Sequence, residues 1–150
     1  MRVVVQRVRE ASVDIGGTTK GKIGHGLLVF VGIEESDTPE DAGWLCGKIA
    51  RLRIFDDAVG VMNLAVTDVR GEVLVISQFT LHAGTKKGNR PSYIRAARPE
   101  KAIPLYNHFL ELMQGYLETP VQSGEFGACM QVRLVNDGPV TILIDSRNKE

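Results

Sequence analysis

Thr80 and His82 are the two residues whose types and spacing come closest to a catalytic pair in this sequence. They follow the apolar run 73–76, so we expect Thr80 near the end of a buried strand and His82 on the same strand face. A threonine nucleophile needs a base within hydrogen-bond reach and a third group that orients this base. Side chains at positions i and i+2 of a strand stand further apart than that. Two roles stay open for Thr80: a nucleophile, or a residue that lines a binding site or bonds the backbone.

The other histidines and the two cysteines form no metal or cofactor motif. His25 lies between glycines, and His108 has no carboxylate or thiol at ligand spacing. The patterns HExxH, CxxC and GxGxxG and the P-loop do not occur. We therefore expect no metal and no cofactor. We also expect Cys46 and Cys129 to be reduced, packed thiols.

A stretch rich in turn-forming residues, Asn-Asp-Gly-Pro-Val-Thr at 136–141, stands between two apolar runs. It predicts a hairpin in which the strands 129–135 and 140–145 pair with each other. Pro139 has no N–H to donate, so it belongs at the start of a strand or on an edge. The Gly138–Pro139 bond is trans by default. A cis bond would reverse the chain sharply and fix the direction of the neighbouring carbonyls.

Two of these segments, Ser-Gln-Phe-Thr-Leu at 77–81 and the run at 136–141, resemble the signature motifs of the D-aminoacyl-tRNA deacylases. The segments 5–8, 88–93 and 123–128 extend the similarity in the family's order. The resemblance therefore covers the chain from end to end. It implies a single deacylase domain over residues 1–150, with a barrel-like core of two sheets. It further implies a homodimer that acts on the 3′ acceptor end of D-aminoacyl-tRNA.

The activity implied by the resemblance is editing: hydrolysis of the ester between a D-amino acid and the terminal ribose of a tRNA. The 2′-hydroxyl of that ribose would help to activate water, while the protein positions the ester and supplies oxyanion donors. The backbone N–H groups of Phe79 and Thr80 are the candidate donors. Ser77, Gln78, Phe79 and Thr80 would contact the substrate.

Selectivity is assigned by the same resemblance to Gly138 and Pro139. In the family this bond is cis, and the turn enters the partner's pocket, where two carbonyls leave no room for an L side chain. Glycine has no side chain to exclude, so glycyl-tRNA mischarged on tRNA(Ala) would also be cleaved. Arg7 and Asn136 would support the turn. From the residues alone, Arg7 is equally well explained as a surface arginine whose stem covers apolar residues.

Two other functions compete with this interpretation. One is an esterase that depends on Thr80 as nucleophile, and the other is a nucleic-acid-binding module of the same fold without hydrolysis. Lys86, Lys87 and Arg90 stand in a loop rich in glycine and lysine, and are either solvated charges or contacts to the tRNA backbone.

The overall composition is that of one ordinary globular domain. The chain has 150 residues, of which 43% are hydrophobic, and its 18 basic residues balance 18 acidic ones. This balance argues against a protein whose function depends on non-specific binding to phosphate groups. The first residues lack the apolar core of a signal peptide, and no apolar run reaches membrane-spanning length. We therefore expect a cytoplasmic protein without membrane contact.

The elements that must position these residues are read from the hydrophobic pattern. Short strands are predicted at 3–8, 11–15, 18–23, 27–31, 53–55 and 73–77, with 62–69 extended and the hairpin at the end. A helix is predicted from Pro39 with Thr38 as N-cap, and a second from Pro99 to about Glu118. Pro104 predicts either a kink or a later start near Ile103. The fold class is α+β, mostly antiparallel sheet with two helices packed outside, and the barrel-like closure is implied by the resemblance alone.

Overall fold

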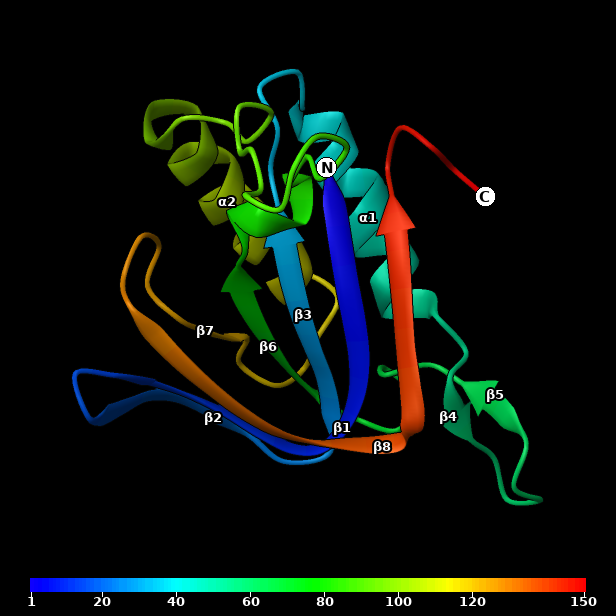
Figure 1. The fold of residues 1–150 in the computed structure, drawn as a ribbon. Helices are drawn as coiled ribbons and strands as arrows, with labels where there is room; N and C mark the ends of the chain where they lie inside the picture. Colours follow the sequence, from blue (N-terminus) through cyan, green and yellow to red (C-terminus); the bar gives the residue numbers. More distant parts are fainter.

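The computed structural model describes residues 1–150. Two helices lie on one face of a strongly curved mixed sheet, whose lower part bends away from them (Figure 1). This is the α+β, barrel-like arrangement that was predicted. No helix has the length and apolar character needed to cross a membrane. In chain order the elements are β1 (Arg2–Ile15), β2 (Thr18–Ile23), β3 (Gly26–Gly32), α1 (Pro39–Arg51), β4 (Phe55–Asp56), β5 (Met62–Leu64), β6 (Glu72–Ser77), the 3₁₀ turn η1 (Phe79–His82), α2 (Pro99–Gln114), β7 (Gln122–Ser123) and β8 (Met130–Asp145).

The main sheet has six strands, in the order β2-β1-β3-β6-β7, with β8 added along the other side of β1. The pairs β1–β2, β1–β3 and β1–β8 are antiparallel, whereas β3–β6 and β6–β7 are parallel. The short strands β4 and β5 form a separate antiparallel pair. Most strand pairs are thus antiparallel, as expected, and the parallel neighbours β3 and β6 end at the same edge of the sheet.

The hairpin predicted between 129–135 and 140–145 is wrong. Both runs belong to one strand, β8, which pairs antiparallel with β1 from Arg2↔Asp145 to Ile15↔Met130. The register jumps in the middle: Gln6 faces Thr141, but Val8 faces Asn136. Four residues of β8, 137–140, therefore stand opposite the single residue Arg7, and we call this segment the 137–140 bulge. The turn residues were recognised correctly, but they interrupt a strand instead of reversing it.

Other predicted boundaries shift by a few residues. The runs 3–8 and 11–15 form one long strand, β1, and only 62–64 of the extended run 62–69 is a strand. Helix α2 begins at Pro99, continues through Pro104 and ends at Gln114, four residues earlier than predicted. Helix α1 begins where Thr38 predicted, and the Asp41 carboxylate accepts a hydrogen bond from the Thr38 N–H at 2.9 Å.

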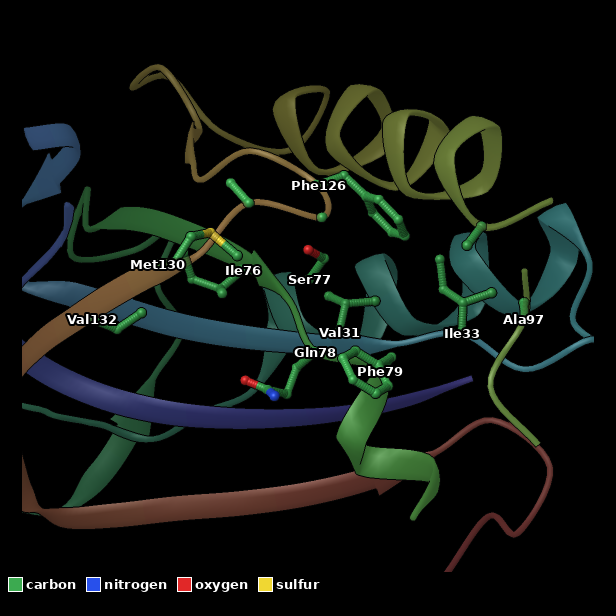
Figure 2. Close-up of a pocket in the computed structure, with 13 residues that line it drawn as sticks. Val31, Ile33, Ile76, Ser77, Gln78, Phe79, Ala97, Phe126, Met130 and Val132 are labelled. Carbon is green, nitrogen blue, oxygen red and sulfur yellow. The ribbon is translucent and has the colours of Figure 1, made fainter. Parts of the chain in front are cut away.

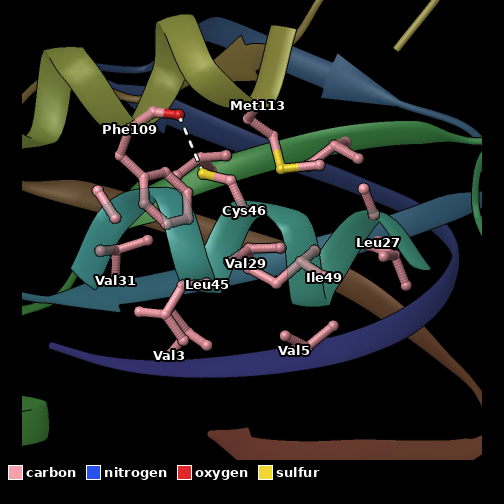
Figure 3. Packing of buried hydrophobic residues seen from close by; sticks show 14 of the residues in the cluster. Val3, Val5, Leu27, Val29, Val31, Leu45, Cys46, Ile49, Phe109 and Met113 are labelled. Carbon is pink, nitrogen blue, oxygen red and sulfur yellow. Dashed lines mark hydrogen bonds between the residues drawn. The ribbon is translucent and has the colours of Figure 1, made fainter. Parts of the chain in front are cut away.

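The larger core lies between the helices and the sheet (Figure 3). On β1 and β3 the side chains that face the helices alternate along each strand, for example Val3 and Val5, and Val29 and Val31. Cys46 on α1 donates its thiol to the Phe109 carbonyl of α2 at 3.5 Å, and its burial raises its pKa to about 12. Cys46 is therefore the packed thiol that was predicted, whereas Cys129 is exposed and that part of the prediction is wrong.

A smaller core fills the other face, where the sheet curls. It contains buried side chains of β1, β2, β3 and β6, and side chains of β8 pack on it. Because β3 contributes Leu27 and Val29 to one core and Leu28 to the other, it is buried on both faces, as its continuous apolar sequence predicted. The outer side of β8 has no partner strand.

Candidate active site

A cavity of about 260 Å³ opens where β3 and β6 end (Figure 2). Its wall is mostly apolar, with Val31 at the end of β3, Ile33 just after it, and Met130 at the start of β8. Ser77 and Gln78, which follow the buried part of β6, contribute the polar groups. The carboxyl ends of neighbouring parallel strands are a common location for ligands. The cavity is therefore the candidate active site.

One wall of the cavity is an aromatic side chain, Phe126, from the loop between β7 and β8. Its ring lies against Tyr106 of α2, with ring centroids 5.9 Å apart. The Tyr106 hydroxyl donates to the buried carbonyl of Val75 on β6 at 3.0 Å, and burial raises the pKa of this phenol. Helix α2 thus fixes Phe126 relative to the strand that carries Ser77.

The strand β6 ends at Ser77, and residues 79–82 form the 3₁₀ turn η1. Phe79 lines the cavity and is 56% exposed. The N–H groups of Phe79 and Thr80 open the turn, so they have no carbonyl partner within it. The turn lies close to β3 at Gly32, where an added Cβ would stand 2.9 Å from the Gln78 carbonyl oxygen and from the Leu81 Cβ. Glycine at this position allows the turn to reach the mouth of the cavity.

The expectation that Thr80 and His82 share a strand face is wrong, because they lie on this 3₁₀ turn. The Thr80 hydroxyl accepts a hydrogen bond from the Gln78 side chain. His82 is 1% exposed and directs its Nδ1 towards Glu34 Oε2, 3.6 Å away. No hydrogen bond joins Thr80 to His82, and neither ring nitrogen of His82 has a hydrogen-bond partner. The geometry does not supply Thr80 with a histidine base.

Arg7 lies opposite the 137–140 bulge and is 6% exposed. Its Nη1 donates to the buried carbonyl of Ile54 at 2.6 Å, and its Nε donates to the Asp137 carbonyl at 3.3 Å. The same Nε lies 3.2 Å from the Asp137 carboxylate, which also receives Arg9 Nε at 3.0 Å. The hydrogen bond from Arg9 and the charges of both arginines lower the pKa of Asp137. Arg7 is therefore a buried side chain with several partners and not a surface arginine.

Asn136 closes the base of the bulge. Its side-chain amide donates to the Arg7 carbonyl and to the Val140 carbonyl, each at 3.0 Å. The first bond joins β8 to β1, and the second closes the bulge within β8. Within the bulge, Gly138 and Pro139 are exposed. Their peptide bond is cis and not trans, the default for a bond before proline, and Gly138 has a φ of +114°.

Gly138 and Pro139 do not line the cavity of their own chain. The bulge lies beside Arg7, which pairs with Leu27 of β3, whereas the cavity begins at Val31, which pairs with Val3. Four residues of β3 separate the two levels, about 13 Å along the strand. The structure thus brings Ser77, Gln78 and Phe79 together, and it holds Gly138 and Pro139 at a distance from them.

The basic residues Lys86, Lys87 and Arg90 are exposed on the loop between η1 and α2. This loop reaches the mouth of the cavity at its last residues, since Ala97 is part of the wall. Phe126, Met130, Ile33 and Tyr106 were not singled out from the sequence as site residues. Only the resemblance at 123–128 contained a signal for one of them, Phe126.

Comparison with known proteins identifies the family. The family model described as D-Tyr-tRNA(Tyr) deacylase matches residues 4–145. The chain is 63% identical to a protein of Akkermansia muciniphila named D-aminoacyl-tRNA deacylase, over the full length of both. The chain belongs to the D-Tyr-tRNA(Tyr) deacylase family. The resemblance noted in the sequence is thereby confirmed, and the family is one of ester hydrolases.

One further relative has the same name, and two solved structures have a similar fold. A Parabacteroides distasonis protein of the same name is 61% identical over the full length of both chains. A solved structure named c-Myc DNA Unwinding Element Binding Protein has a TM-score of 0.92 at 41% identity, and covers 97% of this chain and 98% of its own. A structure described as a probable eukaryotic D-amino acid tRNA deacylase has a TM-score of 0.82 at 15% identity, and covers 95% of this chain and 97% of its own. This last likeness concerns the fold alone.

Proposed function

We propose that this protein hydrolyses the ester that joins a D-amino acid to the terminal ribose of a tRNA, and that it spares the L-amino acid ester. The supporting observation is the cavity, mostly apolar with Ser77 and Gln78 at one side, at the carboxyl ends of two parallel strands. The family assignment gives the substrate class. Charged tRNA is used in the cytoplasm, which is the location we expect for this activity.

The complete site is a homodimer in this proposal. Gly138 and Pro139 are exposed and lie away from the cavity of their own chain, while the cavity is open to solvent. The bulge of one subunit would enter the cavity of its partner. Arg7 and Asn136 hold the bulge from below, so that its carbonyls keep one direction.

Water is the nucleophile in the proposed reaction. Its oxygen bonds to the ester carbonyl carbon, the bond from that carbon to the ribose oxygen breaks, and the ribose oxygen leaves with a proton. The ribose 2′-hydroxyl assists the activation of water, and the N–H groups of Phe79 and Thr80 stabilise the oxyanion. The Thr80 hydroxyl already accepts a hydrogen bond from Gln78, which suits a positioning role.

Selection of the mirror image depends on the two carbonyls of the bulge. They would stand where an L side chain must lie, whereas a D side chain points away from them. Many D-amino acids are then accepted. Glycine is accepted too, including glycine mischarged on tRNA(Ala), because it has no side chain for the carbonyls to exclude.

The deciding measurement is the release of D-tyrosine and L-tyrosine from charged tRNA by the purified protein. We expect rapid release of D-tyrosine and of glycine, and release of L-tyrosine at the uncatalysed rate. Equal rates for the two mirror images would contradict the proposal. A glycine inserted at the exposed turn Gly16–Gly17, where an added Cβ would meet nothing within 4 Å, is the matched control for a glycine inserted after Gly138. Only the second insertion should allow release of L-tyrosine.

A substitution of Thr80 distinguishes a mechanism in which water is the nucleophile from one in which Thr80 is the nucleophile. Thr80→Ala should keep most of the activity, and a tRNA with a 2′-deoxy terminal ribose should not be cleaved. Thr85→Ala, in the exposed loop beyond η1, is the control. A Thr80→Ala protein that binds charged tRNA but cannot cleave it would favour the Thr80-dependent esterase instead.

Mixed dimers test whether the site is shared between subunits. One variant has the glycine insertion after Gly138, and the other has its cavity filled by Ala97→Trp. Each homodimer should lack selective D-tyrosine release. In a mixed dimer, the open cavity of the first subunit faces the intact bulge of the second, so one of the two sites should recover. Absence of any recovery in isolated mixed dimers would mean that the bulge acts elsewhere.

A nucleic-acid-binding module without hydrolysis is the second candidate. The name of the 41%-identical structure, c-Myc DNA Unwinding Element Binding Protein, favours it. The equal numbers of basic and acidic residues count against strong non-specific binding. This function would be preferred if the protein bound DNA and tRNA equally well, whether or not the tRNA had an amino acid attached.

A further inference from the structure

Large apolar side chains are exposed beside the mouth of the cavity. Tyr93 is 40% exposed and Ile94 is 92% exposed, both in the loop between η1 and α2. The Tyr93 ring meets Phe79 edge to face, with centroids 5.0 Å apart and an angle of 75° between the rings. Since Phe79 also lines the cavity, the aromatic pair continues the apolar wall onto the outer surface.

These side chains are held in place by the loop that presents them. Gly84 and Ser92 exchange two backbone hydrogen bonds, of 2.7 and 2.9 Å, across the neck of the loop. The Ala96 N–H donates to the Tyr93 carbonyl at 3.0 Å, and Arg95 pairs with Glu34 at 2.8 Å. Hydrogen bonds and an ion pair thus hold the chain both before Tyr93 and after Ile94, so the two exposed side chains stand on an ordered segment.

The same loop is strongly basic. Residues 84–98 contain five basic side chains and no acidic one, although the whole chain has 18 of each. Arg95 is paired with Glu34, so the remaining positive charge is that of Lys86, Lys87, Arg90 and Arg98. Aromatic surfaces flanked by unpaired cations are the pattern by which proteins bind unpaired nucleotides.

We propose that Phe79 and Tyr93, with Ile94 next to them, form a stacking surface for an unpaired base at the 3′ end of the tRNA. The inference rests on the proposed function, because it places the ester in the cavity. A ribose whose ester enters the cavity beside Phe79 leaves its base outside, over the aromatic pair. Lys86, Lys87 and Arg90 then face the phosphates that precede it.

A second copy of this chain is the competing occupant of the surface. In a symmetric contact through this loop, the same patch meets itself. The four unpaired basic side chains of one copy would then approach the four of the other, without an acidic residue in the loop to pair with them. Charge complementarity therefore favours a polyanion over a second copy.

The test uses uncharged tRNA with 2-aminopurine as its terminal base, since the fluorescence of this base falls when it stacks. The wild-type protein should quench the fluorescence. Tyr93→Ala should abolish the quenching and weaken tRNA binding about 5- to 150-fold, the usual effect of one lost stacking contact. Tyr93→Phe should retain both. Tyr116→Ala removes another tyrosine that is 40% exposed, and should change neither.

Ile94→Ser and a hydrolysis assay complete the design. Ile94 is almost fully exposed, so Ile94→Ser should leave the melting temperature unchanged and still weaken tRNA binding. On D-tyrosyl-tRNA, Tyr93→Ala should raise KM and change kcat little. Hydrolysis with an unchanged KM and unchanged quenching would overturn the stacking surface alone. Failure of the wild-type protein to hydrolyse D-tyrosyl-tRNA would overturn the proposed function. The fluorescence measurement would still show whether the terminal base stacks on this surface. A change of oligomeric state in Ile94→Ser, without loss of tRNA binding, would assign the surface to a second copy.

Discussion

The Arg7 guanidinium lies beneath Asp137, with its Nε 3.3 Å from the Asp137 carbonyl oxygen and 3.2 Å from the carboxylate. The two residues belong to paired strands, and they meet because β8 has four residues where β1 has one. The contact therefore fixes the base of the 137–140 bulge. It is the one direct link between a buried side chain of β1 and the residue that precedes Gly138.

Removing the Arg7 side chain should destabilise the protein strongly. Arg7→Ala leaves the buried Ile54 carbonyl without its donor and Asp137 without one of its two arginines, which should cost about 3 kcal/mol. Arg9→Ala is the control, because Arg9 also pairs with Asp137 but is 76% exposed, and should cost less than about 1 kcal/mol. Urea unfolding measures both. Equal losses would mean that Arg7 contributes only as a surface charge.

Gly138→Ala should disturb the bulge in a way that other glycine turns do not share. Gly138 has a φ of +114°, and an added Cβ would stand 2.9 Å from Arg7 Nη2. We expect a loss of about 1–3 kcal/mol and partial loss of the discrimination against L-tyrosyl-tRNA. Gly60→Ala has the same kind of backbone, with a φ of +81°, but nothing within 4 Å, and should lower stability less without changing discrimination. The measurements are unfolding in urea and the D/L ratio of hydrolysis rates.

Gly32→Ala should displace the turn that carries Phe79. The new Cβ would stand 2.9 Å from the Gln78 carbonyl oxygen and 3.1 Å from the His82 Cδ2, so η1 must move away from β3. We expect a loss of about 1–3 kcal/mol and a fall in kcat for D-tyrosyl-tRNA. Gly43→Ala in α1 meets nothing within 4 Å and should stabilise the helix by about 0.5–1 kcal/mol. An unchanged kcat in Gly32→Ala would mean that catalysis does not depend on the position of η1.

His82 should make the protein less stable at mildly acidic pH. Burial lowers its pKa, the Gly32 backbone and the nearby Glu34 carboxylate raise it, and the N-terminal ammonium and Arg2 lower it, with a net downward shift. The unfolded chain then binds a proton more readily than the folded one. The contribution of neutral His82 to the free energy of unfolding is fully present above the ordinary histidine pKa of about 6.5, and it falls as the pH drops below that value. The slope for one proton is at most about 1.4 kcal/mol per pH unit.

Urea unfolding at pH 7.5 and 5.5 measures this effect. His82→Leu should reduce the difference in unfolding free energy between the two pH values. The variant replaces the buried imidazole with an apolar side chain, and no hydrogen bond is lost because neither ring nitrogen of His82 had a partner. His25→Gln, at an exposed position, should leave the difference as in the wild type. The same pH dependence in His82→Leu and the wild type would assign the effect to other groups.

Lys86 and Lys87 should control the salt dependence of tRNA binding. Both are exposed on the basic loop, and each phosphate contact that is lost should reduce the slope of log K against log salt by about 0.7–0.9. We therefore expect a shallower slope for the double variant with both lysines changed to alanine. Changing Lys20 and Lys22, exposed on β2, removes the same charge elsewhere and should leave the slope nearly unchanged. Equal slopes for the two double variants would show that net charge alone matters.

The strands and helices with strong periodicity were predictable from the sequence. The first hairpin, the central strand β3 and the start of α1 at Thr38 lie where their residues predicted. The resemblance identified the segment of Ser77, Gln78 and Phe79, which the structure places at the cavity. These features depend on residues close together in the chain.

The features that the sequence did not predict depend on partners far away in the chain. A turn-forming run such as 136–141 closes a hairpin or interrupts a strand, and the choice is made here by β1, which pairs on both sides of it. The end of β6 is similar, since η1 forms where Gly32 allows close approach, not where β propensity ends. Phe126 enters the site because Tyr106, 20 residues earlier, packs against it.

The 137–140 bulge has one more consequence, for the outer side of β8. Such a side presents a row of unpaired N–H and C=O groups, which can recruit strands of other molecules and start an aggregate. The bulge divides this row into two short stretches, Met130–Val135 and Thr141–Asp145. A strand of another molecule that pairs with one stretch is out of register with the other stretch. The bulge that exposes Gly138 and Pro139 should thus also limit the growth of fibrils from the longest edge of the sheet.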